Sequence, residues 1–339
     1  VVFCANLGAA LCAYYAFKSV SKSRRTVILG VVLYTLMPYR FTNIFSRGDL
    51  GETLALTFWP LVIVGMYHIL LGDRKKWYFL VIGFSGILQS HILSIMFVMA
   101  FCLISFLAFF GNMWKEKRYI EIAKAAGLTV LLNLWFLVPF LYYYFKEPLG
   151  TELLRWSGYF DQSINPSNLV QSISLYNKQY FSLGLPLLGC IGIGVLHLVC
   201  DKKKMENRLD RYLFFLLILG VILTWMTTGY FPSKDMRRNG LLDSVMTMLQ
   251  FPWRFLGPAC TCFLFAGLIW LSKSEILKPY KNLIFALFIG LNLLTVQTIP
   301  TDNIHMPYSS SAATASKGHG SKMAANIGIF YPHEWRLEG

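Results

Sequence analysis

The segment from residue 37 to 61, "MPYRFTNIFSRGDLGETLALTFWPL", places four charged side chains in an otherwise apolar stretch: Arg40, Arg47, Asp49 and Glu52. Arginine forms paired hydrogen bonds with phosphate oxygens. Arg40 and Arg47 bracket a turn, so they predict an anion site suited to a lipid phosphate. Asp49 and Glu52 are the carboxylates that could act as catalytic groups beside it. Charges near membrane depth are costly and tend to be functional.

A structural interpretation of the same four residues stays open. Asp49 at the N-cap of the following helix, with Glu52 three positions later, is close to a capping box. Both carboxylates would favour the positive end of that helix, and the arginines would extend to the membrane interface. Arg47, Gly48 and Asp49 spell an adhesion tripeptide, but a helix boundary at a membrane is not an exposed loop tip.

Two further motifs carry candidate residues. Arg254 follows Trp253 in "LQFPWRFLGPA" (249–259), as a second phosphate ligand, a partner for a carboxylate, or an interfacial anchor. His91 follows Gln89 in "LQSHILS", as a substrate-contacting or proton-handling group, or as part of a polar turn between two helices. We expect six residues to converge on one cavity: Arg40, Arg47, Asp49, Glu52, His91 and Arg254.

Several chemistries have no support in the sequence. It contains no P-loop, no GxGxxG, no GxSxG and no HExxH pattern. The seven cysteines lie in or at the ends of apolar runs, which predicts neither a disulfide framework nor a zinc site. The residues therefore identify no cofactor and no metal ligands, and a divalent-metal requirement is not readable from them.

Composition places the chain among helical membrane proteins. Of 339 residues, 55% are hydrophobic and 14% are charged, with a mean hydropathy of +0.51. Soluble domains have about 25% charged residues. Since a spanning helix needs about 20 mostly apolar residues, we predict an all-α polytopic bundle of about ten transmembrane helices. The predicted spans are 1–17, 26–38, 53–71, 77–90, 92–111, 125–145, 181–200, 212–230, 254–271 and 282–299.

Positive charge is concentrated in alternate loops. The segments 18–25, 72–76, 112–124, 201–211 and 272–281 hold 19 of the 31 lysines and arginines. The positive-inside rule makes these loops cytoplasmic and accounts for the net charge of +14 without a nucleic-acid partner. The candidate residues then lie at the extracytoplasmic face of the plasma membrane, with both ends of this chain also outside.

Further expectations concern the ends. The chain opens without Met inside an apolar run, so we interpret it as an N-terminally truncated fragment missing an odd number of spans. Residues 1–299 form the transmembrane domain, and 300–339 form a flexible extracytoplasmic tail with the start of an outer domain. The apolar pattern near 241–249 predicts a short helix lying on the outer membrane surface.

Three segments together carry a family resemblance: "PYRFTNIFSRGDLGETLALTFWPLVI" (38–63), "GILQSHILSIMF" (86–97) and "LQFPWRFLGPA" (249–259). They resemble bacterial multispanning proteins with the 6-pyruvoyl-tetrahydropterin synthase-related domain, which are similar to GT-C membrane glycosyltransferases and YfhO-type proteins. The resemblance implies a GT-C-like bundle. It also implies sugar transfer from a polyprenyl-phosphate donor to an unknown extracytoplasmic acceptor, in cell-envelope glycan or lipid modification.

The resemblance also assigns roles. Arg40, Arg47 and Arg254 would bind the donor phosphate. The key carboxylate of such enzymes lies in the first outer loop, which we expect ahead of Val1, so Asp49 and Glu52 are the best remaining carboxylates and His91 is an additional candidate. The partners implied are membrane lipids, the lipid-linked donor and the acceptor.

Two alternatives stay open. The first is a transporter or flippase of lipid-linked envelope precursors, and the second is a non-catalytic envelope-assembly protein. Transporters commonly show inverted repeats and broken helices with charges at the membrane midplane. The sequence shows no clear repeat, and its charged candidates lie at one face, which favours chemistry at the surface.

Overall fold

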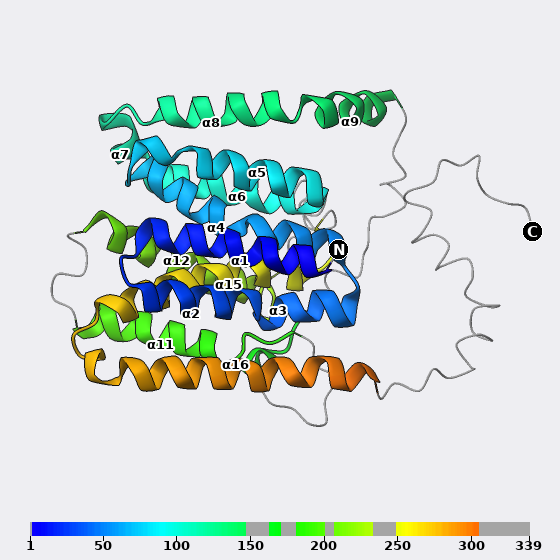
Figure 1. Ribbon diagram of the computed structural model, residues 1–339. Helices are drawn as coiled ribbons and strands as arrows, with labels where there is room; N and C mark the ends of the chain where they lie inside the picture. The colour runs from blue at the N-terminus through cyan, green and yellow to red at the C-terminus, as the bar shows by residue number, and fades with distance from the viewer. Residues whose placement is uncertain (1, 147–162, 171–180, 201–206, 233–248, 305–339) are drawn as a thin grey trace, which may run out of the picture.

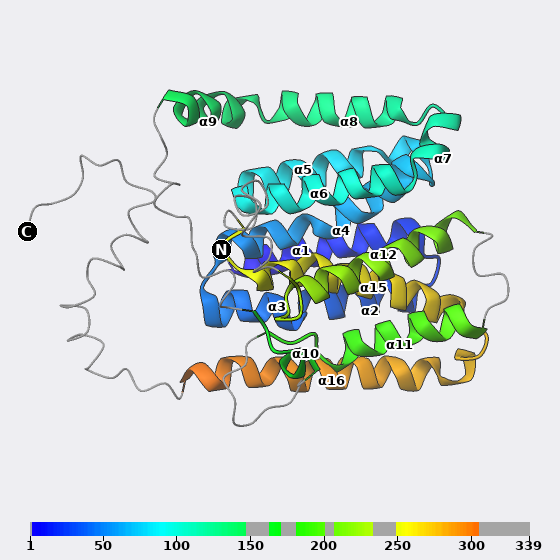
Figure 2. The ribbon, with the colours of Figure 1, turned by 180° about the vertical axis from the view of Figure 1, so that it is seen from behind.

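The computed structural model describes residues 2–146, 163–170, 181–200, 207–232 and 249–304. Within these ranges every regular element is a helix (Figure 1), apart from an isolated bridge between Ile164 and Thr228. The helices lie side by side with their axes roughly aligned, as both Figure 1 and Figure 2 show. The predicted all-α class is confirmed for this part of the chain.

The longer helices follow the chain in this order: α1 (Val2–Val20), α2 (Arg24–Thr35), α4 (Leu50–Leu70), α5 (Tyr78–Ser90), α6 (Ile92–Ala108), α8 (Tyr119–Leu132), α9 (Leu134–Lys146), α11 (Leu185–Cys200), α12 (Arg208–Met226), α15 (Leu256–Lys273) and α16 (Lys281–Ile304). Short helical segments join them: α3 (Pro38–Phe41), η1 (Thr42–Arg47), η2 (Arg74–Lys76), α7 (Phe110–Lys115), α10 (Pro166–Val170), η5 (Pro252–Phe255) and η6 (Lys278–Tyr280).

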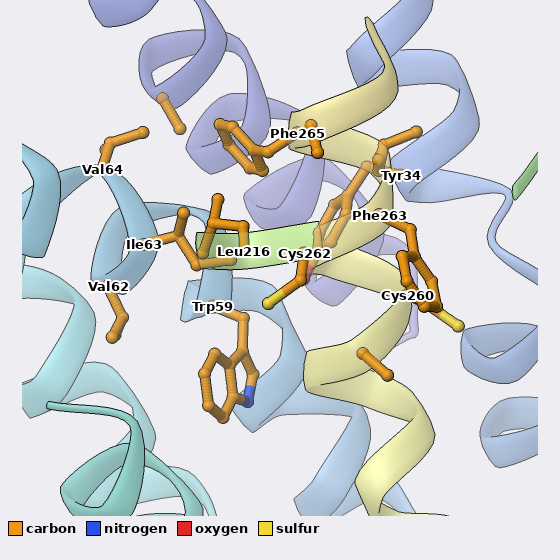
Figure 3. Packing of buried hydrophobic residues seen from close by; sticks show 14 of the residues in the cluster. Tyr34, Trp59, Val62, Ile63, Val64, Leu216, Cys260, Cys262, Phe263 and Phe265 are labelled. Atoms are coloured by element: carbon orange, nitrogen blue, oxygen red, sulfur yellow. The ribbon is translucent and has the colours of Figure 1, made fainter. Parts of the chain in front are cut away.

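The centre of the bundle is α15, in which every residue from Leu256 to Leu271 is buried. It packs against α12 and α11, and α4 packs against α5 and α1. Figure 3 shows side chains of α4 (Trp59 and Ile63), α12 (Leu216) and α15 (Cys262 and Phe265) gathered in this core. Such contacts are dispersion contacts between close-packed side chains, which hold helices together even in lipid.

Glycine lets two helix pairs approach closely. A Cβ on Gly65 would lie 2.4 Å from the Leu80 backbone nitrogen, so α4 and α5 meet backbone to backbone. A Cβ on Gly267 would lie 2.4 Å from the Cys190 Cβ, which brings α11 equally close to α15. Small residues at such crossings are typical of membrane helices.

The prediction of about ten spans is not supported. Helices lie where all ten are predicted, but among the described residues only five are long and apolar enough to cross a membrane: 24–47, 50–70, 208–226, 252–273 and 278–297. The bent pair α8 and α9 would make a sixth. The 13 residues of α5 reach only about 20 Å at 1.5 Å per residue, short of a bilayer core of about 30 Å. Asn6 and Lys18 lower the apolarity of α1.

The basic segments gather at one end of the bundle, which we call the basic end. Contacts link them in a series: Arg74 to Glu116, Arg208 to Glu116, Lys273 to Asp210, and Arg25 to Asn282. This end lies at the left in Figure 1, opposite α3 and the start of α1. We call the opposite end, which holds η1, the start of α4 and η5, the site end. This arrangement fits the predicted topology, although the orientation in a membrane stays a prediction.

The pair α8 and α9 bends by 75° at Asn133. The buried Asn133 side chain donates to Ser85 Oγ (2.8 Å) and accepts from Gln89 Nε2 (2.7 Å), both on α5. Gln89 of the "LQSHILS" motif therefore ties α5 to this bend. The surface helix predicted near 241–249 and the outer domain predicted for the C-terminal tail lie almost wholly outside the described residues.

Candidate functional site

The site end is built on an irregular turn between α3 and α4. Pro38 suits the first turn of α3, which continues as the π-helix η1. Gly48 then takes a left-handed conformation (φ 63°), which glycine adopts without steric cost, and the chain reverses into α4. The Asp49 side chain caps α4 by accepting from the Glu52 backbone N–H at 2.9 Å. This confirms the predicted N-cap.

Glu52 is the centre of the site and is only 4% exposed. Its carboxylate accepts from Arg47 Nη1 at 2.8 Å, from Asn43 Nδ2 at 3.3 Å and from the Tyr39 hydroxyl. The capping box is therefore only half formed, because the Glu52 side chain turns away from the Asp49 backbone toward these donors. A carboxylate can be buried at low cost only where cations and hydrogen-bond donors contact its oxygens in this way.

Two arginines from distant parts of the chain meet at Glu52. Arg47 also binds Asp49, with 3.0 Å between Nη2 and Oδ2. Arg254 Nε lies 3.4 Å from Glu52 Oε2, and Arg254 Nη1 donates to the Leu249 carbonyl oxygen and to Gln250 Oε1. Of the three interpretations that the sequence leaves open for Arg254, the structure shows the one in which it pairs with a carboxylate. Pro252 begins η5, which places Arg254 beneath the start of α15.

His91 lies at the break between α5 and α6, against the first turn of α4. A Cβ on Gly51 would lie 3.2 Å from His91 Cδ2, and His91 Nδ1 is 2.8 Å from Ser94 Oγ. Burial is the main cause that lowers the pKa of His91 below its ordinary value, Arg254 lowers it further, and Glu52 opposes the shift. The lowered pKa favours the neutral imidazole.

Arg40 does not join the other candidates. Its guanidinium is fully buried and donates to the Thr53 carbonyl oxygen (3.3 Å) and to Asn6 Oδ1 (3.2 Å), beside the ring of Tyr34. These contacts pin α3 to α1 and α4. The role of Arg40 in phosphate binding stays a prediction that its surroundings do not favour.

The sequence analysis missed two hydrogen-bond donors to Glu52. Tyr39 and Asn43 precede Arg47 at intervals of four residues, and all three side chains reach the same cluster. The four-residue spacing was the available signal, but the sequence analysis places residues 39–52 in a loop between the predicted spans 26–38 and 53–71. It also missed the ring stack beside the cluster, in which Trp253 lies 4.6 Å from Phe181 and 4.5 Å from Phe251 between centroids.

The cluster balances its charges, because it holds two guanidinium groups and two carboxylates next to the imidazole of His91. It lies at the end of the bundle, with Asp49 and Arg47 the more exposed members. Such a site can exchange an internal carboxylate for an external anion. Within the described ranges, no group of three histidine, cysteine or acidic side chains is placed to hold a metal ion.

Comparisons with family models, with curated proteins and with solved structures give no match to this chain. The fold and composition define its class as an all-helical protein with several helices that could span a membrane. The family resemblance stays a prediction.

Proposed function

We propose that this chain is an integral membrane glycosyltransferase-like protein that takes a sugar from a polyprenyl-phosphate donor at the site end, in cell-envelope glycan or lipid modification. The observation that supports it most is the meeting of Arg47 and Arg254 at Glu52. Two guanidinium groups at one point suit a phosphodiester, because arginine binds phosphate oxygens through paired hydrogen bonds.

An unsatisfied donor on Arg254 supports the exchange of Glu52 for a phosphate. Its Nε–H lies near Glu52 as an ion pair, without a hydrogen-bond partner, in a side chain that is only 7% exposed. A buried donor without an acceptor is costly. A phosphate oxygen would satisfy it better than the Glu52 carboxylate does.

In the proposed reaction, an acceptor hydroxyl attacks the anomeric carbon of the donor sugar, and the bond from that carbon to the phosphate oxygen breaks. Arg47 and Arg254 stabilise the negative charge that develops on the leaving polyprenyl phosphate. Asp49 or Glu52, released from an arginine by the phosphate, accepts the hydroxyl proton as general base. The site end lies opposite the basic end, and the positive-inside rule would place it outside the cell.

The test uses the full-length protein reconstituted in vesicles with a polyprenyl-phosphate-linked radiolabelled sugar. Arg47→Lys and Arg254→Lys keep the charge but remove the planar fork, so we expect transfer to fall by one to two orders of magnitude, as is typical for loss of one stabilising donor. Arg25→Lys, at the basic end, is the matched control. Full transfer activity in both site variants would refute the assignment.

A transporter is the second candidate, and the breaks in the helices at the site favour it. The π-helix η1, the 3-10 turn η5 and the interruption at His91 all meet there. Broken helices form the binding sites of many transporters. Movement of the labelled lipid across the vesicle membrane without release of its sugar would support this candidate and contradict transfer.

A further inference from the structure

A second charged cluster lies at the basic end, away from Glu52. Glu116 receives three arginines from three basic segments: Arg118 Nε at 2.7 Å, Arg208 Nη2 at 2.8 Å, and Arg74, whose Nη2 donates to the Glu116 carbonyl oxygen at 2.5 Å and lies 3.7 Å from its carboxylate. One carboxylate therefore faces three guanidinium groups, which leaves an excess of positive charge.

The three arginines differ in exposure. Arg118 is buried and its Nη1 donates to the carbonyl oxygens of His68, Ile69 and Gly72, so it closes the end of α4. The side chains of Arg74 and Arg208 are 42% and 45% exposed. Arg118 is therefore structural, while the other two present charge to the surroundings.

The chain around Glu116 concentrates further charge at this surface. Lys115 and Lys117 flank it in sequence, and both are exposed, as is Lys75 beside Arg74. Lys117 holds a left-handed backbone (φ 54°), which is unfavourable for a residue with a side chain. Such strain persists only when the surrounding structure enforces it. Here it accompanies a turn in which Glu116 binds the arginines.

An aromatic column leads along α6 and α7 to the same cluster. Ring centroids are 5.6 Å apart between Phe106 and Phe110, 5.9 Å between Phe110 and Trp114, and 5.6 Å between Trp114 and Tyr119. Trp114 is 63% exposed, the most of the four. Tryptophan and tyrosine with one apolar and one polar side settle at the level of lipid head groups.

Exposed apolar residues of α6 extend this surface away from the charges. Met99, Leu103 and Leu107 are each more than half exposed. An acyl chain is the complement of such a face, and an anionic head group is the complement of the arginines above it. From α6 to Glu116 the surface changes from apolar to aromatic to basic. This order matches the acyl chain, the interfacial region and the anionic head group of a lipid.

We propose that this corner binds an anionic phospholipid of the bilayer, with its head-group phosphate at Arg74 and Arg208 and an acyl chain along Phe110 and Trp114. The charge excess at Glu116 selects anionic over zwitterionic head groups. This inference does not depend on the proposed transfer reaction.

The experiment places the full chain in phosphatidylcholine bilayers that contain increasing amounts of phosphatidylglycerol with brominated acyl chains, and it follows quenching of tryptophan fluorescence. We expect a saturable quenching component that brominated phosphatidylcholine does not give. We also expect Trp114→Phe to lack that component. In Arg74→Gln/Arg208→Gln, the apparent affinity for the anionic lipid should fall at least tenfold, because each lost positive charge lowers the affinity by about fivefold.

Two other double variants keep the test decisive. Arg24→Gln/Lys278→Gln removes the same charge from exposed positions of the basic end and should change the affinity less than twofold. Lys75→Gln/Lys117→Gln leaves the ion pairs of Glu116 in place and should give an intermediate loss, which guards against misfolding of the arginine variant. Equal losses in the arginine variant and in Arg24→Gln/Lys278→Gln, or equal quenching by both lipids, would overturn the proposal.

Discussion

Replacing Glu52 with Gln removes the charge that joins the two arginines while keeping the shape of the side chain. In the wild type the side chain of Glu52 is 5% exposed, and those of its partners Arg47 and Arg254 are 14% and 7% exposed. The substitution leaves the buried guanidinium group of Arg254 without a carboxylate partner, and it leaves the partly buried Arg47 with Asp49 alone. Breaking a buried ion pair from one side costs about 3–5 kcal/mol, so we expect Glu52→Gln to lower the free energy of unfolding by about that amount.

The measurement is equilibrium unfolding in mixed detergent micelles, followed by helical circular dichroism. Glu275→Gln is the matched control, because Glu275 pairs with Lys278 at 3.0 Å with both side chains largely exposed, and such pairs are worth about 0–1 kcal/mol. The double variant Arg47→Gln/Glu52→Gln should be less destabilised than the sum of its single variants. A loss below about 1 kcal/mol for Glu52→Gln, equal to the control, would refute the view that Glu52 organises the site end.

Three further outcomes are expected from the geometry. Burial and nearby guanidinium groups lower the pKa of His91 in the folded chain below the ordinary histidine pKa of 6.5. As the pH falls below 6.5, the unfolded chain therefore binds a proton at His91 before the folded chain does, and thermal stability should decline. His91→Gln should remove that part of the pH dependence. Gly65→Ala should cost about 1–3 kcal/mol against the backbone of Leu80, whereas Gly111→Ala, in open space, should be neutral or slightly stabilising in the same unfolding assay. Asn133→Leu leaves its partners on α5 unpaired, so hydrogen exchange should quicken in α8 but not in α15.

The sequence was sufficient to predict the features that depend on local chemistry. An acidic residue ahead of an apolar run predicted the N-cap at Asp49, and the apolar run 254–271 predicted the helix α15. Basic loops alternate with less basic ones along the chain, and this predicted which segments meet at one end of the bundle. The inference needs only the order of the helices and the charge of the loops between them. The pairing of Arg254 with a carboxylate came from placing both at the same end.

Other features depend on packing that no local pattern records. Arg40 and Arg47 are equivalent in sequence, yet Arg40 points into the bundle toward Asn6 and Arg47 toward Glu52. Which of two arginines on one turn is buried depends on how α1 and α4 pack. The number of spans failed for a related reason, since apolar runs such as 78–90 are short helices buried partly against α4 and α8 rather than full crossings.

The π-helix at Thr42–Arg47 has a consequence for comparing this chain with any relative. A π-helix accommodates one residue more than the α-helix that would replace it. Removing one residue between 42 and 47 would restore the α-helix and rotate the next part of the chain by about 100°, which would turn Arg47 away from Glu52. In a sequence alignment, an arginine at this column is therefore weak evidence of the same site. The number of residues between Pro38 and Gly48 is the better criterion, because that number sets the direction in which the Arg47 side chain leaves the helix toward Glu52.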